Sequence, residues 1–120
     1  MRGDRVLLLA LFVRGCAIST DPTRCTEEAR AGMALTLRDA TTGRPVSVGA
    51  RIIARDGEYS ESTEFNVNGT YPLAFERRGA YEVTVEHPGY RPWVRIGIQV
   101  TGDACHVTTI FITADLEPRA

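Results

Sequence analysis

Apolar and polar residues alternate with a period of two along most of the chain beyond Gly32, a pattern typical of strands that bury one face. Short segments rich in Gly, Pro, Asp and Thr separate the alternating stretches and predict turns. No stretch has the 3.6-residue period of an amphipathic helix, so we expect an all-β domain. The clearest alternation lies at 33–37, 50–54, 81–85 and 94–100, followed by a β-branched run at 105–114.

Two weaker segments complete the expected set of strands. The segment 58–64 is polar and predicts an edge strand, and 71–76 is a shorter candidate. About seven short strands with turns between them are typical of a β-sandwich, so we expect seven strands in a Greek-key arrangement. The apolar residues of the segment 94–100 are expected to face the core, which places Trp93 on the outward face of the same strand.

The first residues of the chain have the features of an export signal. Arg2 and Arg5 precede an unbroken apolar run at 6–13. A positive segment followed by a short apolar run and small residues is typical of a secretory signal. A run of this length is too short to span a bilayer, which takes about twenty residues. We therefore expect an exported protein, with residues 1–15 as the signal peptide and no transmembrane anchor.

Cys16 directly follows this signal segment. The stretch 11–16 (LFVRGC) resembles a bacterial lipobox, since Val13 is aliphatic and Gly15 is small, although Arg14 departs from the usual small or apolar residue. The resemblance implies that Cys16 is lipidated and anchors the chain in the cell envelope, facing the periplasm or in the outer membrane. Two or three acyl chains suffice for stable anchoring. The alternative is ordinary signal cleavage near Ala17, which releases a soluble protein.

The cysteine count is consistent with export. If Cys16 carries lipid, Cys25 and Cys105 remain as a pair, and a disulfide persists in an oxidising compartment. A bond closing a loop of about eighty residues stabilises the fold by roughly 4 to 5 kcal/mol in the chain-entropy model. The competing use of these thiols is a metal site with His106, but the paired short spacing of zinc ligands is missing. We predict the disulfide and no metal or other cofactor.

The composition supports one globular domain after the signal. The chain has 120 residues, of which 43% are hydrophobic and 24% charged, which is ordinary for a globular protein. Its formal net charge of -1 lacks the basic surface that nucleic-acid binding needs. We expect a tether at 16–31 and a single sandwich domain at 32–117.

Two motifs in this domain resemble those of a known family. The segment 35–46 (LTLRDATTGRPV), followed by Ala50, matches a strand and a D-x-x-T-G-x-P-V turn. The segment 79–85 (GAYEVTV), followed by Gly89 and Tyr90, matches a G-x-Y strand and a later G-Y pair. Together they resemble the carboxypeptidase regulatory-like domain, over roughly residues 32–115. The resemblance implies a transthyretin-like sandwich that serves as a non-enzymatic accessory module, with Tyr81 and Tyr90 hydrogen-bonding backbone groups.

No residue set in the sequence predicts catalysis. His87 lies in a turn and His106 at the start of a strand, and neither has an evident nucleophile beside it. The transthyretin-like hydroxyisourate hydrolases end in a Tyr-Arg-Gly-Ser signature that this chain lacks. Evenly spaced acidic residues offer a weak calcium site, although a solvated edge strand accounts for them better. These residues are Glu58, Glu61 and Glu64.

The expected function is therefore binding or structural support of an envelope protein or a glycan. The alternative is a dedicated carbohydrate-binding module. Sugar-binding sandwiches stack pyranose rings on exposed aromatic side chains, and the candidates here are Tyr71, Tyr90 and Trp93. The competing interpretation is that Trp93, beside Pro92, covers the end of the core.

Overall fold

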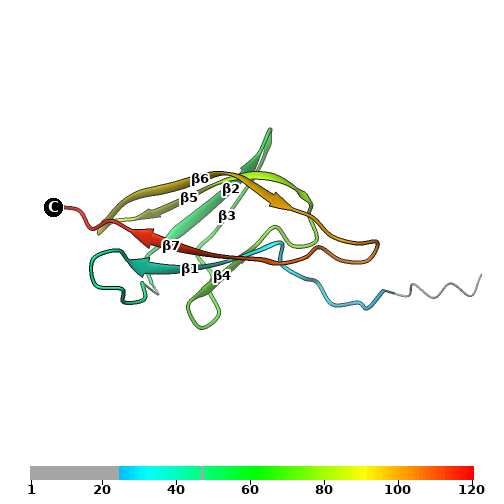
Figure 1. The fold of residues 1–120 in the computed structure, drawn as a ribbon, viewed down its shortest axis with the longest axis horizontal. Helices are drawn as coiled ribbons and strands as arrows, with labels where there is room; N and C mark the ends of the chain where they lie inside the picture. Colours follow the sequence, from blue (N-terminus) through cyan, green and yellow to red (C-terminus); the bar gives the residue numbers. More distant parts are fainter. Residues whose placement is uncertain (1–24, 47) are drawn as a thin grey trace, which may run out of the picture.

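Seven strands form two sheets that pack face to face, and no helix occurs in the part of the chain described (Figure 1). The computed structural model describes residues 25–46 and 48–120, so Cys16 and the expected signal peptide lie outside it. The strands are β1 (Met33–Asp39), β2 (Arg51–Asp56), β3 (Tyr59–Thr63), β4 (Thr70–Leu73), β5 (Gly79–His87), β6 (Tyr90–Val100) and β7 (Ile110–Leu116).

The chain passes from one sheet to the other after β1, β3, β4 and β6. One sheet has the order β4-β1-β7 and the other has the order β3-β2-β5-β6. All neighbouring strands are antiparallel except β1 and β7, which pair in parallel from Met33 with Ile110 to Asp39 with Leu116. The prediction of an all-β, seven-stranded sandwich of the transthyretin-like type is confirmed, and the polar segment after Gly57 forms the edge strand β3 as expected.

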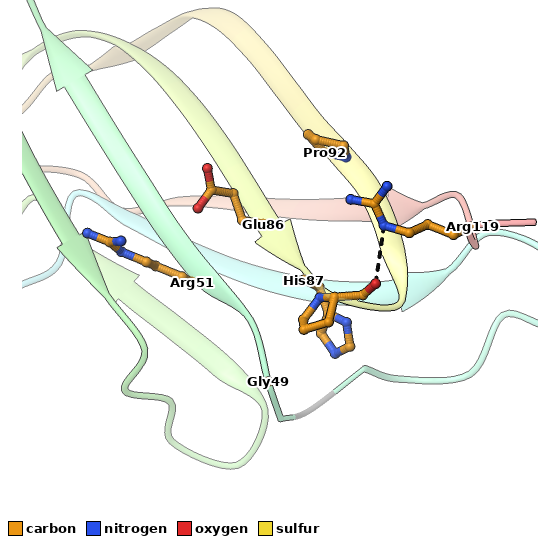
Figure 2. A pocket seen from close by; sticks show the side chains of 7 residues that line it. Gly49, Arg51, Glu86, His87, Pro92 and Arg119 are labelled. Carbon is orange, nitrogen blue, oxygen red and sulfur yellow. Dashed lines mark hydrogen bonds between the residues drawn. The ribbon is translucent and has the colours of Figure 1, made fainter.

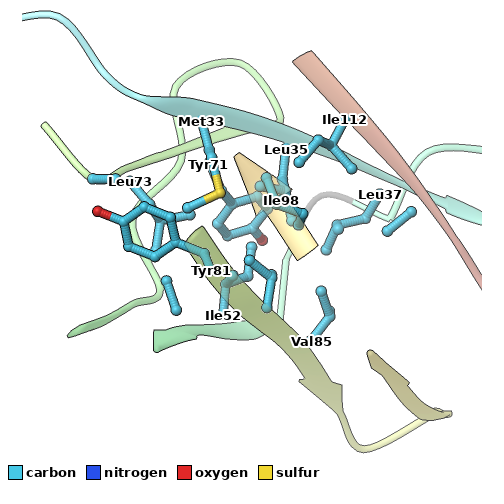
Figure 3. Packing of buried hydrophobic residues seen from close by; sticks show 14 of the residues in the cluster. Met33, Leu35, Leu37, Ile52, Tyr71, Leu73, Tyr81, Val85, Ile98 and Ile112 are labelled. Carbon is cyan, nitrogen blue, oxygen red and sulfur yellow. The ribbon is translucent and has the colours of Figure 1, made fainter. Parts of the chain in front are cut away.

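The core lies between the sheets and is built by the period-two alternation. On β1 the side chains of Met33, Leu35 and Leu37 are almost completely buried, as are those of Ile52 on β2 and Val83 on β5. Figure 3 shows these β1 side chains meeting residues of the opposite sheet. The described residues contain no buried charged or polar side chain, so burial of apolar area, at roughly 25 cal/mol per Å², is the main stabilising contribution of this interior.

The prediction that the apolar residues of 94–100 face the core is wrong for the first half of this segment, which lies in β6. Val94 and Ile96 are 52% and 73% exposed, whereas Ile98 and Val100 are buried. The pairing with β5 shifts between Val83–Arg95 and Tyr81–Ile98, and Gly97, which lies between Arg95 and Ile98, has a positive φ of 74°. An extra residue of this kind is a β-bulge, which exchanges the two faces of a strand. Before the bulge it is therefore Trp93, not Val94, that faces the core.

Two further strands differ from their expected bounds. β4 ends at Leu73 rather than continuing to residue 76, because Ala74 and Glu76 adopt positive φ angles of 56° and 51°. The last strand begins at Ile110 rather than at residue 105. Its expected start is instead a turn, in which the Asp103 carboxylate accepts the amide hydrogens of Cys105 and His106.

The predicted disulfide is confirmed, since Cys25 and Cys105 are bonded with their Cα atoms 5.1 Å apart. Residues 25–31, within the expected tether, contain no strand. Backbone hydrogen bonds also hold this segment to the sandwich, from Glu76 to the Arg30 carbonyl and from Gly32 to the carbonyls at the end of β4. We call residues 25–31 the N-terminal strap.

Candidate functional site

The two sequence motifs meet in space at one end of the sandwich. Asp39 ends β1, and its Oδ1 atom accepts the amide hydrogens of Thr41 and Thr42, which organises the turn before Pro45. The hydroxyl of Tyr90 donates to Asp39 Oδ2 at 2.7 Å, so the prediction of a backbone partner for Tyr90 is wrong, because the turn brings this carboxylate within reach of the hydroxyl. These bonds, the one from the Thr42 amide first, hold the pKa of Asp39 below its usual value. The contact links the turn of the first motif to the G-Y pair of the second.

Tyr81 of the second motif has a similar structural role. Its ring is buried, and its hydroxyl donates to the Arg77 carbonyl at 2.9 Å, as expected from the resemblance to a tyrosine corner. The Arg77 guanidinium also donates to this hydroxyl and lies over the Tyr59 ring, 3.7 Å from its centroid. The hydroxyl of Tyr59 donates to Glu61, and this bond raises the pKa of Tyr59 to about 12. These contacts link β3, the turn before β5 and β5, and they stabilise the fold.

The three aromatic candidates for sugar binding do not form a common surface. Tyr71 pairs with the buried Leu35 and is itself completely buried, and burial raises the pKa of its hydroxyl. Trp93 pairs with Val85 and packs against the core from the other sheet, with the Arg95 guanidinium 5.2 Å from its ring centroid. Tyr90 is partly buried and bound to Asp39. The exposed aromatic platform expected from the sequence is therefore not formed.

His106 lies in an arrangement that the sequence did not predict. Its Nδ1 atom is 2.5 Å from Glu76 Oε2, and its Nε2 atom is 2.8 Å from Thr26 Oγ1. Carboxylate, imidazole and hydroxyl in this order also occur in triads that activate a nucleophile. The three residues come from distant parts of the chain, so no local motif marked them.

The surroundings of His106 favour a structural role for this arrangement. The nearby amides of Cys105 and His106 both donate to Asp103, so neither is available to stabilise an oxyanion. Glu76 also accepts the amide hydrogens of Arg30 and Val107. The bonds to Glu76, the one to His106 first, lower the pKa of this carboxylate. Together they fasten the N-terminal strap beside the disulfide.

His87 is held equally firmly at the opposite end of the sandwich. Its Nδ1 atom accepts the amide hydrogen of Gly89 at 2.9 Å, so the ring proton lies on Nε2 and is donated to the Val48 carbonyl. The ring also packs edge-on against Tyr90, with centroids 5.1 Å apart. Both ring nitrogens are thus occupied by hydrogen bonds, and His87 has a structural role.

His87 lines a pocket of about 390 Å³ on the outer side of the β5–β6 hairpin (Figure 2). Its charged side chains are Arg51 of β2, Glu86 of β5 and Arg119 of the C-terminal segment. Pro88 and Pro92 provide its apolar surface. The volume lies within the usual range of small-molecule sites, roughly 300–1,000 Å³. No local sequence motif marked this site, because its charged residues belong to three separate segments.

The acidic residues considered for calcium do not come together as ligands. Within residues 25–46 and 48–120, no group of three or more His, Cys, Asp or Glu side chains is placed to hold a metal ion. Glu61 instead accepts the Ala74 amide hydrogen and the Tyr59 hydroxyl, and so links β3 to the end of β4. In the same part of the chain, no helix is long and apolar enough to cross a membrane.

Comparison with known proteins agrees with this fold and its motifs. No curated protein matches the chain. The profile of the carboxypeptidase regulatory-like domain matches residues 33–113, which is more than half of the chain and includes both motifs and strands β1 to β6. Domains of this family are non-catalytic sandwiches. The chain belongs to the carboxypeptidase regulatory-like domain family.

Proposed function

We propose that this protein is an exported envelope lipoprotein, anchored through Cys16, whose sandwich serves as a non-enzymatic accessory module for an envelope protein or glycan. The observation that carries the proposal is the Cys25–Cys105 disulfide. Structural disulfides persist mainly in oxidising compartments outside the cytoplasm. Among the three cysteines of the sequence, this bond leaves Cys16 for lipid attachment.

The arrangement of the N-terminal strap supports a role at a membrane surface. The strap is joined to the domain by the disulfide and by the Thr26–His106 hydrogen bond. A lipid on Cys16 would therefore be separated from a fixed point at Cys25 by a short segment, which keeps the sandwich close to the membrane. The exposed pocket at the β5–β6 hairpin remains open to a partner.

Cell fractionation tests the anchor. The wild-type chain and a Cys16→Ala variant are expressed in a bacterial host with labelled palmitate, and membrane and soluble fractions are compared. We expect labelled wild-type protein in the membrane fraction and unlabelled Cys16→Ala protein outside it, because two or three acyl chains give stable binding and none gives no anchor. A Cys25→Ala/Cys105→Ala variant controls for cysteine loss and should remain labelled. Unlabelled wild-type protein, or a membrane-bound Cys16→Ala variant, would contradict the proposal.

A further inference from the structure

Arg119 is held in a fixed orientation at the edge of the pocket. Its amide donates to the Gly89 carbonyl at 3.0 Å, and its Nε atom donates to the Pro88 carbonyl at 3.1 Å. Figure 2 shows the second bond as the dashed line beside the hairpin. In the described part of the chain, the two Nη atoms have no partner. A guanidinium whose orientation is already fixed loses less entropy when it binds a planar oxyanion such as a carboxylate.

The other charges of the pocket make it favourable for an anion that also carries hydroxyl groups. Arg51 and Glu86 face each other across β2 and β5, and the long contact of Arg51 with Ser62, at 3.4 Å, leaves most of its donors open. Two guanidinium groups and one carboxylate line the pocket, so a ligand carboxylate is attracted to the arginines. Glu86 accepts hydrogen bonds but donates none, and it therefore requires a donor on the ligand.

The volume and apolar lining of the pocket favour a ring over a small open-chain ion. Pro88 and Pro92 add apolar surface to the lining of the pocket, which suits the C–H face of a sugar. Arg51 and Glu86 stand on adjacent strands, whose spacing is about 4.8 Å. On a pyranose ring that carries a carboxylate, the carboxylate and the hydroxyls point outward from the ring, so one ligand can meet both the arginines and Glu86.

We propose that this pocket binds a hexuronate unit of an acidic glycan. The sugar carboxylate accepts hydrogen bonds from Arg119 and Arg51, and a ring hydroxyl donates to Glu86. The inference rests on the proposed function in one respect, because it takes the partner of the accessory module to be a glycan. It replaces the aromatic platform by a charged pocket as the basis of recognition.

Titration of the purified, disulfide-bonded domain with sodium D-galacturonate tests the proposal. The amide signals of Gly49, Glu86 and Gly89 are followed by heteronuclear NMR at constant ionic strength. D-Galactose, which lacks the carboxylate, and sodium acetate, which lacks the ring, are titrated in parallel. We expect galacturonate to bind at least about tenfold more tightly than either, since a charge-assisted bidentate hydrogen bond contributes about 1.5 kcal/mol or more.

Variants assign the binding to the pocket. Arg119→Gln and Arg51→Gln should each weaken galacturonate binding by about tenfold or more. Arg55→Gln is the matched control, because Arg55 faces Glu82 across the same two strands but lies outside the pocket. Equal binding of galacturonate and acetate, no response to galacturonate, or the same loss in Arg55→Gln would overturn the proposal. Failure here is distinguishable from failure of the proposed function, because fractionation measures the anchor independently of any ligand.

Discussion

Replacing Cys25 and Cys105 by alanine removes the covalent link between the N-terminal strap and the turn before β7. The strap keeps its other contacts in this variant, namely the Thr26–His106 hydrogen bond and the bonds to Glu76. All seven strands lie outside the strap, so the native fold should persist. The main effect of the replacement is therefore expected in the unfolded chain, which gains conformational freedom.

The sequence separation of the two cysteines sets the size of this effect. The bond closes a loop with a separation of 80 residues. The chain-entropy relation then gives a loss of stability of about 4.5 kcal/mol at 25 °C. With a urea dependence of about 1.5 kcal/mol per M, the unfolding midpoint should fall by about 3 M. The dependence on urea should also rise slightly, because an unfolded chain without the link exposes more surface.

Equilibrium unfolding in urea at pH 7 measures the difference. The single tryptophan, Trp93, packs against the core, so its fluorescence reports on the sandwich, and far-ultraviolet circular dichroism reports on the strands. Reduced wild-type protein is the control and should match the double variant. A midpoint change equivalent to less than about 1 kcal/mol, with the strand signal retained, would refute the chain-entropy reasoning.

Replacements at three further positions test separate parts of the fold. Leu35→Ala should cost about 3 kcal/mol, because the side chain is completely buried and a cavity remains; urea unfolding measures this, and a loss below about 1 kcal/mol would contradict the packing. Gly97→Ala should cost about 1 kcal/mol through its positive φ alone, since an added Cβ meets no atom within 4 Å; Gly97→Asn should cost less, and equal stability of all three proteins would exclude backbone strain. The pKa of Glu76 lies below its ordinary value of 4.5, so the ionised carboxylate stabilises the folded state fully above pH 4.5. This contribution to stability disappears as the pH falls through the lowered pKa. The difference in stability between wild type and Glu76→Gln should therefore narrow on acidification. Unfolding midpoints of both proteins from pH 7 to about 3 measure this, and a difference between the two proteins that stays constant with pH would contradict it.

The sequence by itself was sufficient for the strands whose inner faces are regular. On β1 and β5 the period-two alternation predicted the buried residues, because the side chains of a strand point alternately to its two faces. The count of cysteines predicted the Cys25–Cys105 bond once Cys16 was assigned to the lipid. The Asp39 turn and the G-Y pair indicated the family, and their contact in the fold gives a physical reason for their occurring together.

Only the tertiary structure decided which face β6 presents and which distant residues meet. The bulge at Gly97 depends on pairing with β5, so the alternation within β6 alone predicted the wrong face for Val94 and Ile96. The parallel pairing of β1 with β7 likewise depends on contacts between the two ends of the domain. The pocket charges and the contacts of His106 come from separate segments, and local periodicity contains no information about their distance. Side-chain alternation is a local property of the backbone, whereas strand register and the residues gathered at one site are set by packing between the sheets.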